Sequence, residues 1–134
     1  MMSQLNWQLS ERVAELVSAE LGSCVANVAR AFRCFRSELP AKAAIVQGIW
    51  MIGGQPGLHV WIEAGEMIID PTLVCESNTA LRQTATHHPI DRFTEAEFAA
   101  RHKYEVIAPG ARLEMDLSWD DPRVEELLDR IDPP

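Results

Sequence analysis

A ten-residue apolar run in the middle of the chain constrains the fold more than any other feature. Residues 43–52 read Ala-Ala-Ile-Val-Gln-Gly-Ile-Trp-Met-Ile, a mostly apolar and β-branched stretch that is typical of a well-buried central strand. Two further strand-like runs follow at residues 58–63 and 66–70, after a glycine-rich stretch at residues 53–57 that predicts a loop. The core of this chain is therefore expected to form around a sheet.

Two helices are predicted ahead of this sheet. Ser10 is expected to cap the first helix, and Gly22 suits the left-handed residue that ends it. Ser23 is expected to cap the second helix, whose apolar residues recur at helical spacing in one stripe: Val25, Val28, Ala29, Phe32 and Phe35. This pattern makes Cys24 the first residue of the second helix.

The second half of the chain gives weaker signals for strands than for helices. Residues 75–89 are polar and irregular, which predicts a long surface loop. Thr94–Glu97 has the form of a capping box and begins a helix. Residues 104–108 and 112–117 resemble strands, the second of them at a sheet edge, and Asp121-Pro122 opens a final helix.

Length and element order predict one α+β domain over residues 1–134. The chain is long enough to bury its own core, and 47% apolar with 24% charged residues is ordinary for a globular protein. N-terminal helices should pack on an antiparallel sheet, and a short helix should close the chain. The net charge of −8 argues against nucleic acid as a partner, because phosphate binding needs clustered Lys and Arg.

The termini and the cysteines indicate where such a protein would work. The N-terminal segment lacks the basic and apolar regions of a signal peptide, and no apolar run has the length of a transmembrane helix. Three cysteines at irregular spacing do not make a disulfide framework. We therefore expect a cytoplasmic protein that does not bind membranes.

The second predicted hairpin places an imidazole beside a carboxylate. A two-residue turn at Ala64-Gly65 pairs residues whose numbers sum to 129, which sets His59 directly opposite Asp70. Directly opposed residues on one sheet face have Cβ atoms about 4.5–5.5 Å apart. Asp70 can then orient the imidazole and support its charged form.

Cys24 completes a group of residues that could act as an activated nucleophile. The free N–H groups and positive dipole of a helix start stabilise a thiolate, and so does an adjacent imidazolium. A thiol, an imidazole and a carboxylate in contact are the components of a cysteine nucleophile with its base. The backbone N–H of Cys24 is a candidate oxyanion donor, with Gln8 or Gln47 as a candidate for the second.

Several other residues could have either a structural or a functional role. Trp61 shares a strand face with His59 and is expected either to wall the site or to pack in the core, and Gln47 is a candidate substrate-binding residue. Cys34 lies far along the helix of Cys24 and is interpreted as a core residue. Cys75, His87 and His88 show no recognised zinc spacing and fall in the predicted loop, so neither a metal site nor a cofactor is expected.

The residues around the three candidates resemble the transglutaminase-like superfamily of papain-fold cysteine enzymes. In that family a helix begins with the nucleophilic Cys and leads into a strand similar to residues 35–50, where Lys42 replaces the usual Arg. A His-x-Trp strand and an Asp-Pro strand end follow, here His59-Val60-Trp61 and Asp70-Pro71-Thr72. The resemblance covers residues 22–73 and implies a papain-like core.

The resemblance also implies roles and an activity. Cys24 would be the nucleophile, His59 the base and Asp70 its orienting partner, in an enzyme that cleaves amide bonds through an acyl-enzyme intermediate. Hydrolysis of a protein, peptide or peptide-like amide is favoured, because so short a chain has little room for a site that excludes water. Three alternatives stay open: an acyltransferase of the same fold, a catalytically silent module that binds a protein partner, and a redox-sensing thiol protein that pairs Cys24 with Cys34 or Cys75.

Overall fold

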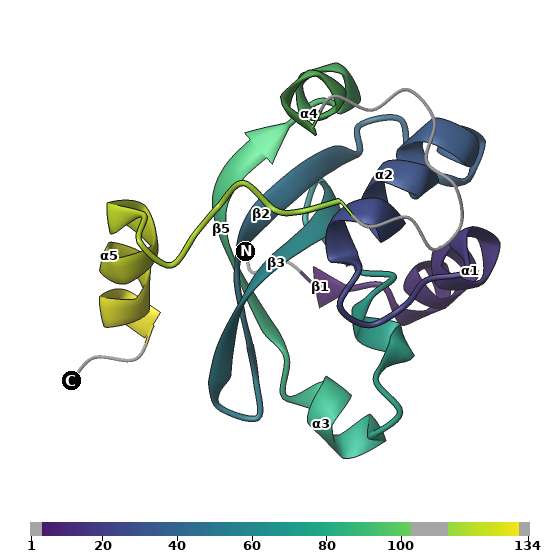
Figure 1. Ribbon diagram of the computed structural model, residues 1–134. Coiled ribbons are helices and arrows are strands. Elements are labelled where there is room, and N and C mark those ends of the chain that lie inside the picture. Colours follow the sequence, from purple (N-terminus) through teal and green to yellow (C-terminus); the bar gives the residue numbers. More distant parts are fainter. Residues whose placement is uncertain (1–3, 103–112, 132–134) are drawn as a thin grey trace.

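The computed structural model describes residues 4–102 and 113–131 of the chain, and the strand predicted at residues 104–108 lies outside them. The fold is mixed α+β, with helices around a five-stranded sheet of order β1-β4-β3-β2-β5 (Figure 1). The strands are β1 (Gln4–Leu5), β2 (Ala44–Ile52), β3 (Gln55–Ala64), β4 (Met67–Ile69) and β5 (Thr86–Phe93). The helices are α1 (Trp7–Val17), α2 (Cys24–Cys34), α3 (Thr79–Gln83), α4 (Glu95–His102) and α5 (Pro122–Ile131), with short 3-10 turns at Arg36–Glu38 and Leu73–Cys75.

The predicted central strand is confirmed as β2. It lies between β3 and β5 and pairs antiparallel with both. Ile45 packs with α1 and α2, Ile49 packs with Leu117 and α5, and Val46 contacts the cluster on the sheet face opposite Ile45. In Figure 1, α1 and α2 lie against the sheet on one side and α5 stands beside β5. Within the described residues, no helix has both the length and the apolar character needed to cross a membrane.

The loop predicted at residues 53–57 is wrong, because the turn is much shorter. Ile52 pairs with Gln55, so only Gly53 and Gly54 lie in the turn. Both have positive φ, 57° and 77°, the conformation that a tight two-residue hairpin turn requires and that glycine adopts without steric cost. As a result β3 begins at Gln55 and is ten residues long.

The predicted register of the next hairpin is also wrong, by two residues. Ala64 pairs with Met67 and Ile62 with Ile69, so the paired numbers sum to 131 and the turn consists of Gly65 and Glu66. Gly65 takes the left-handed conformation, with φ 61°. Because side chains alternate with period two, a shift by two residues leaves every side chain on its predicted face. The face shared by His59 and Asp70 therefore survives the error.

Three other local predictions need correction. The first helix runs from Trp7 to Val17 with Asn6 as its cap, so Ser10 lies inside it, fully buried, and the left-handed residue that ends it is Ser18 instead of Gly22. The sheet is not purely antiparallel, because β1 pairs parallel with β4. Residues 113–117 form no strand, although their hydrophobicity alternates; Leu117 instead packs with Ile49 and with α5.

The loop predicted at residues 75–89 is wrong, because this segment includes a helix and part of a strand. It contains α3 and the first part of β5, which the sequence obscures because β5 is polar and contains Pro89. β5 is an edge strand, and Pro89 lies next to a bulge, where the pairing with β2 shifts between Gln47 and Gly48. Edges and bulges are the places where a sheet tolerates proline.

The helical predictions of the second half are confirmed. Thr94 and Glu97 form the reciprocal capping box, with N···O distances of 2.9 and 3.2 Å. The rings of Phe93 and Phe98 pack at a centroid distance of 5.8 Å, as a hydrophobic staple does. The last helix begins at Pro122, as the sequence predicts.

We predict that Gly48→Ala loosens β5 from the sheet. A Cβ at this position would lie 2.2 Å from the carbonyl oxygen of His88 and 3.0 Å from the backbone of Ile90, so the two strands would have to separate. The expected loss of unfolding free energy is about 1–3 kcal/mol, measured by urea denaturation. Gly54→Ala is the comparison, since a Cβ there meets nothing within 4 Å and only its positive φ of 77° opposes the change.

Candidate active site

Cys24 occupies the start of α2 and lines an open cleft. It is the first residue of the helix, so its backbone N–H has no intrahelical acceptor. The side chain of Ser23 makes no capping hydrogen bond to this turn either. The half-buried thiol lies in a cleft of about 460 Å³. The walls of the cleft are mostly apolar, but Glu114 also lines it; the apolar side chains are Val25, Trp50, Leu58, Leu113 and Met115.

His59 lies in the same cleft, behind Cys24. It is only 1% exposed, and its Nε2 is 2.8 Å from Oδ2 of Asp70. Because Nε2 is engaged in this way, Nδ1 is the ring nitrogen left for the thiol of Cys24, with which the imidazole interacts. The pairing of imidazole and carboxylate that the sequence predicts is present, although Asp70 is diagonal to His59 in the sheet and not directly opposite.

Two indole rings fix the orientation of the imidazole. Trp50 stacks on His59 at a centroid distance of 3.6 Å and an interplanar angle of 18°, and Trp61 lies nearly parallel at 5.9 Å and 19°. Gly57 makes the first contact possible, because a Cβ there would lie 2.6 Å from Nε1 of Trp50. The Trp50 ring can therefore lie across β3 and reach His59.

Asp70 is fully buried, and both of its carboxylate oxygens and its backbone N–H have partners. Its Oδ1 accepts hydrogen bonds from the backbone N–H groups of Thr72 and Leu73, at 3.1 and 3.0 Å. Its own backbone N–H donates to Oγ of Ser10 on α1, at 2.9 Å. This arrangement holds the carboxylate in one position at the end of β4.

A second histidine, His87, which the sequence pattern placed in a loop, completes the group. Nε2 of His87 is 2.7 Å from the same Oδ2 of Asp70, and its side chain is 3% exposed. His87 is the residue of β5 paired with Trp50 of β2. His87 could have been placed at the site from sequence only if β5 had been predicted as a strand paired with β2.

Electrostatic interactions make His59 and Asp70 an ion pair. Burial opposes protonation of His59, but the Asp70 carboxylate, the hydrogen bond to it and the Cys24 side chain together raise the pKa of His59 to about 9. Burial would raise the pKa of Asp70, but the charges of His59 and His87 and their hydrogen bonds hold it well below its usual range. The imidazole beside Cys24 is therefore protonated at neutral pH.

Asn27 joins α2 to the segment that carries Asp70. Its Nδ2 donates to Oγ1 of Thr72 and to the backbone oxygen of Glu20, both at 2.9 Å. The bond to Thr72 links the first turns of α2 to the segment after β4, so Cys24 and Asp70 are held relative to each other.

Neither of the predicted substrate-binding residues reaches the cleft. Trp61 is fully buried against His59 and donates from Nε1 to Oε2 of Glu63 at 2.8 Å, so it walls the imidazole and is closed to substrate. Gln47 is also fully buried and donates to Asp91, the residue opposite it on β5, at 3.0 Å. Gln8 is exposed on α1 and outside the cleft. Cys34, interpreted from sequence as a core residue, is exposed at the end of α2.

His59, Asp70 and His87 are also placed closely enough to be considered as metal ligands. Their nearest ligand atoms lie within 4.8 Å of one another. Around a tetrahedral ion, ligand atoms at about 2.1 Å from the metal are about 3.4 Å apart, whereas both N···O pairs here are separated by 2.7–2.8 Å. These are hydrogen-bond distances, so the geometry fits two N–H donors on one carboxylate oxygen.

No protein-family model matches the chain, and no curated protein or solved structure matches it either. The resemblance to transglutaminase-like enzymes therefore remains a prediction from the motifs of residues 22–73.

We predict that the charged His59 makes stability fall at alkaline pH. A histidine whose pKa rises on folding stabilises the fold fully below its unfolded value of about 6.5, and this contribution is lost as pH rises through the folded value of about 9. The expected loss is on the order of 3 kcal/mol between pH 6.5 and 9.5. Urea denaturation across this range should show the decline in the wild type, and His59→Gln, which cannot titrate, should lack it.

We also predict that Asn27→Leu destabilises the protein and disturbs the cleft. The substitution removes the bonds to Thr72 and Glu20 and leaves the hydroxyl of the buried Thr72 without this donor, at a cost of about 1–3 kcal/mol. Urea denaturation gives the stability change. An unaltered unfolding free energy would contradict the proposed link between α2 and the segment of Asp70.

Proposed function

We propose that this protein is a thiol-dependent enzyme that hydrolyses amide bonds through an acyl-enzyme intermediate on Cys24. One observation carries the proposal: Cys24 and His59 line one cleft, and the ring nitrogen of His59 that faces away from the thiol is bonded to the buried Asp70. The order of nucleophile, base and orienting carboxylate, and the helix start under the cysteine, agree with the papain-like arrangement that the sequence motifs suggest.

The chemistry follows from these positions. The thiolate of Cys24 attacks the amide carbonyl carbon, and the electron pair of the C=O bond moves to oxygen, which the free backbone N–H of Cys24 can stabilise. His59 then gives its Nδ1 proton to the departing amine, which leaves a thioester on Cys24. The neutral His59 next accepts a proton from an attacking water, and collapse of the second intermediate releases the acid and restores the thiolate–imidazolium pair.

The cleft indicates what kind of amide would fit. Its walls are mostly apolar, with Trp50, Leu58 and Met115 among them, so an apolar side chain next to the scissile bond would be buried favourably. Cys24 is half-buried in an open cleft, so water can reach the thioester. We therefore favour hydrolysis of a protein or peptide-like amide over acyl transfer to a second amine.

The test is the rate at which each cysteine is alkylated by iodoacetamide between pH 5 and 10, followed by peptide mass spectrometry. Cys24 should react fast well below pH 8.5, the ordinary pKa of a thiol, because the adjacent imidazolium stabilises its thiolate. His59→Gln should lower the Cys24 rate at pH 6.5 by at least tenfold. Asp70→Asn should lower it less, since the imidazole remains but loses its carboxylate.

The other two cysteines serve as controls within the same molecule. Cys34 is exposed at the far end of α2, while burial and the charges of Asp70 and Glu20 raise the pKa of Cys75. Neither rate should respond to His59→Gln in the folded protein. If Cys24 shows the same pH dependence as Cys34 in the wild type, the enzyme proposal fails and the protein-binding module becomes the better interpretation.

The redox alternative receives little support from these positions. Cys24 and Cys34 are ten residues apart on one helix, about 15 Å along its axis, whereas a disulfide needs Cα atoms within about 7 Å. The thiol of Cys75 contacts the backbone oxygens of Ala19 and Pro71. A Cys24–Cys75 disulfide under mild oxidant would nevertheless contradict the hydrolase proposal, because it would consume the nucleophile.

A further inference from the structure

His87 has no role in the mechanism above, yet it is built into the site. Its Nε2 and that of His59 both bond to Oδ2 of Asp70, at 2.7 and 2.8 Å. Both imidazoles are almost completely shielded from solvent. The edge of the Trp61 ring meets His87 at a centroid distance of 4.9 Å and an angle of 67°, so its orientation is fixed by packing. One carboxylate oxygen therefore serves two histidines from different strands.

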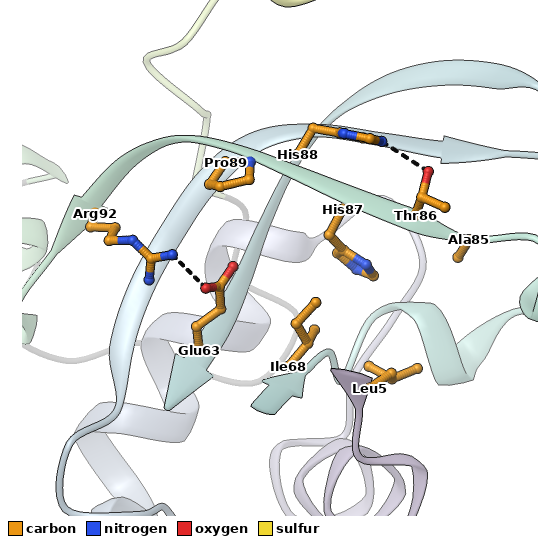
Figure 2. Close-up of a pocket in the computed structure, with 9 residues that line it drawn as sticks. All are labelled: Leu5, Glu63, Ile68, Ala85, Thr86, His87, His88, Pro89 and Arg92. Atoms are coloured by element: carbon orange, nitrogen blue, oxygen red, sulfur yellow. Dashed lines mark hydrogen bonds and ion pairs between the residues drawn. The ribbon is translucent and has the colours of Figure 1, made fainter. Parts of the chain in front are cut away.

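The far side of His87 borders a second cavity, of about 410 Å³ (Figure 2). This cavity shares no lining residue with the cleft of Cys24. Glu63 and Ile68, which line it, alternate along their strands with residues of the α2 core, so the cavity lies on the opposite face of the sheet. A continuous chain of contacts, from Cys24 through His59 and Asp70 to His87, thus joins two separate cavities.

We propose that His87 is a positioning residue for the thiol reaction, which limits how strongly Asp70 holds the proton of His59. A carboxylate that accepts two N–H bonds at one oxygen divides its negative charge between them. The His59 proton is then held less tightly than by a carboxylate devoted to it alone, and it passes more readily to the leaving amine. The inference rests on the proposed function.

Other charged and titratable groups lie around His87, and their influence on His59 must be separated from that of the His87–Asp70 hydrogen bond. His88 is adjacent on β5 and bonds to Thr86 at 2.9 Å, and Arg92 is paired with Glu63 across the second cavity. Among residues 4–102 and 113–131, the groups that face His87 or the groups bonded to it are Asp70, His59, His88, Glu63, Arg92 and, beside Asp70, Cys75, with Cys24 beyond His59. Of these only Asp70 and His59 belong to the contact chain that ends at Cys24.

The experiment compares His87→Gln and His87→Leu. Gln can place an N–H donor where Nε2 of histidine lies, whereas Leu removes the donor and neither residue titrates. His59 is followed directly by NMR titration of its ring nitrogens, and Cys24 by its alkylation rate against pH. In His87→Leu, both the midpoint of His59 and the alkaline limb of the alkylation profile should move upward by about half a pH unit or more, and His87→Gln should restore most of the wild-type value.

The controls separate this inference from the proposed function. His88→Gln alters the neighbouring residue of the same cavity without touching Asp70, and it should leave both profiles in place. If the alkylation rate of Cys24 is the same in the wild type and in His59→Gln, the proposed function fails. The NMR titration midpoint of His59 still shows in that case whether the hydrogen bond from His87 affects His59. If His59→Gln does lower the alkylation rate of Cys24, but the titration midpoint of His59 is the same in His87→Gln and His87→Leu, His87 is only a packing residue and the inference is overturned.

Should His87→Leu fail to fold, as judged by urea denaturation, His87→Met takes its place, because Met also lacks an N–H donor and does not titrate. The titration midpoint of His59 and the alkaline limb of the Cys24 alkylation profile should then lie at higher pH in His87→Met than in His87→Gln. Equal values in these two variants would overturn the inference in the same way.

Discussion

The buried carboxylate of Asp70 is the interaction on which the rest of this site depends. A charge removed from water is tolerated only when its oxygens are fully hydrogen-bonded and opposite charge lies close by. Here two backbone N–H groups bind one oxygen and two imidazoles bind the other. The carboxylate therefore draws together the segment after β4, the middle of β3 and the start of β5. Replacing it would leave both imidazoles without their acceptor.

The sheet topology explains how residues so far apart in sequence meet at this carboxylate. β4 is only three residues long and stops at Ile69, so the edge of β3 beyond Ile62 has no strand beside it there. The segment that follows β4 occupies this place, and the N-terminus of α2 joins it through the bond between Asn27 and Thr72. A longer β4 would cover the edge of β3 that Cys24 needs to approach.

The sequence was most informative where local patterns suffice. The buried strand β2, the helix start at Cys24 and the capping box at Thr94 are fixed by neighbouring residues, so short-range reasoning found them. The juxtaposition of His59 and Asp70 was predicted from a register that was two residues wrong, and it held because alternation tolerates an even shift but not an odd one. The predicted proximity of His59 and Asp70 was therefore correct only because the register error was an even number of residues.

Other parts of the site could not be read locally. β5 is polar and contains Pro89, so its pattern favoured a loop, whereas in the structure it pairs with β2 as a strand. His87 was missed for this reason alone. Trp61 was assigned to substrate because it shares a strand face with His59, and Gln47 was assigned without a geometric reason. The sequence does not show that the indole N–H of Trp61 donates to Glu63 or that the amide nitrogen of Gln47 donates to Asp91.

The stacking of Trp50 on His59 has a consequence for how the site would meet its substrate. One indole is stacked on the imidazole at 3.6 Å, a second lies nearly parallel at 5.9 Å, and Nε2 is bonded to Asp70, so the imidazole is held against rotation about its side-chain bonds. Its conformational freedom is lost when the chain folds, so none remains to be lost when a ligand enters the cleft. Such a base is already positioned before the substrate binds, so none of the binding free energy is used to order it.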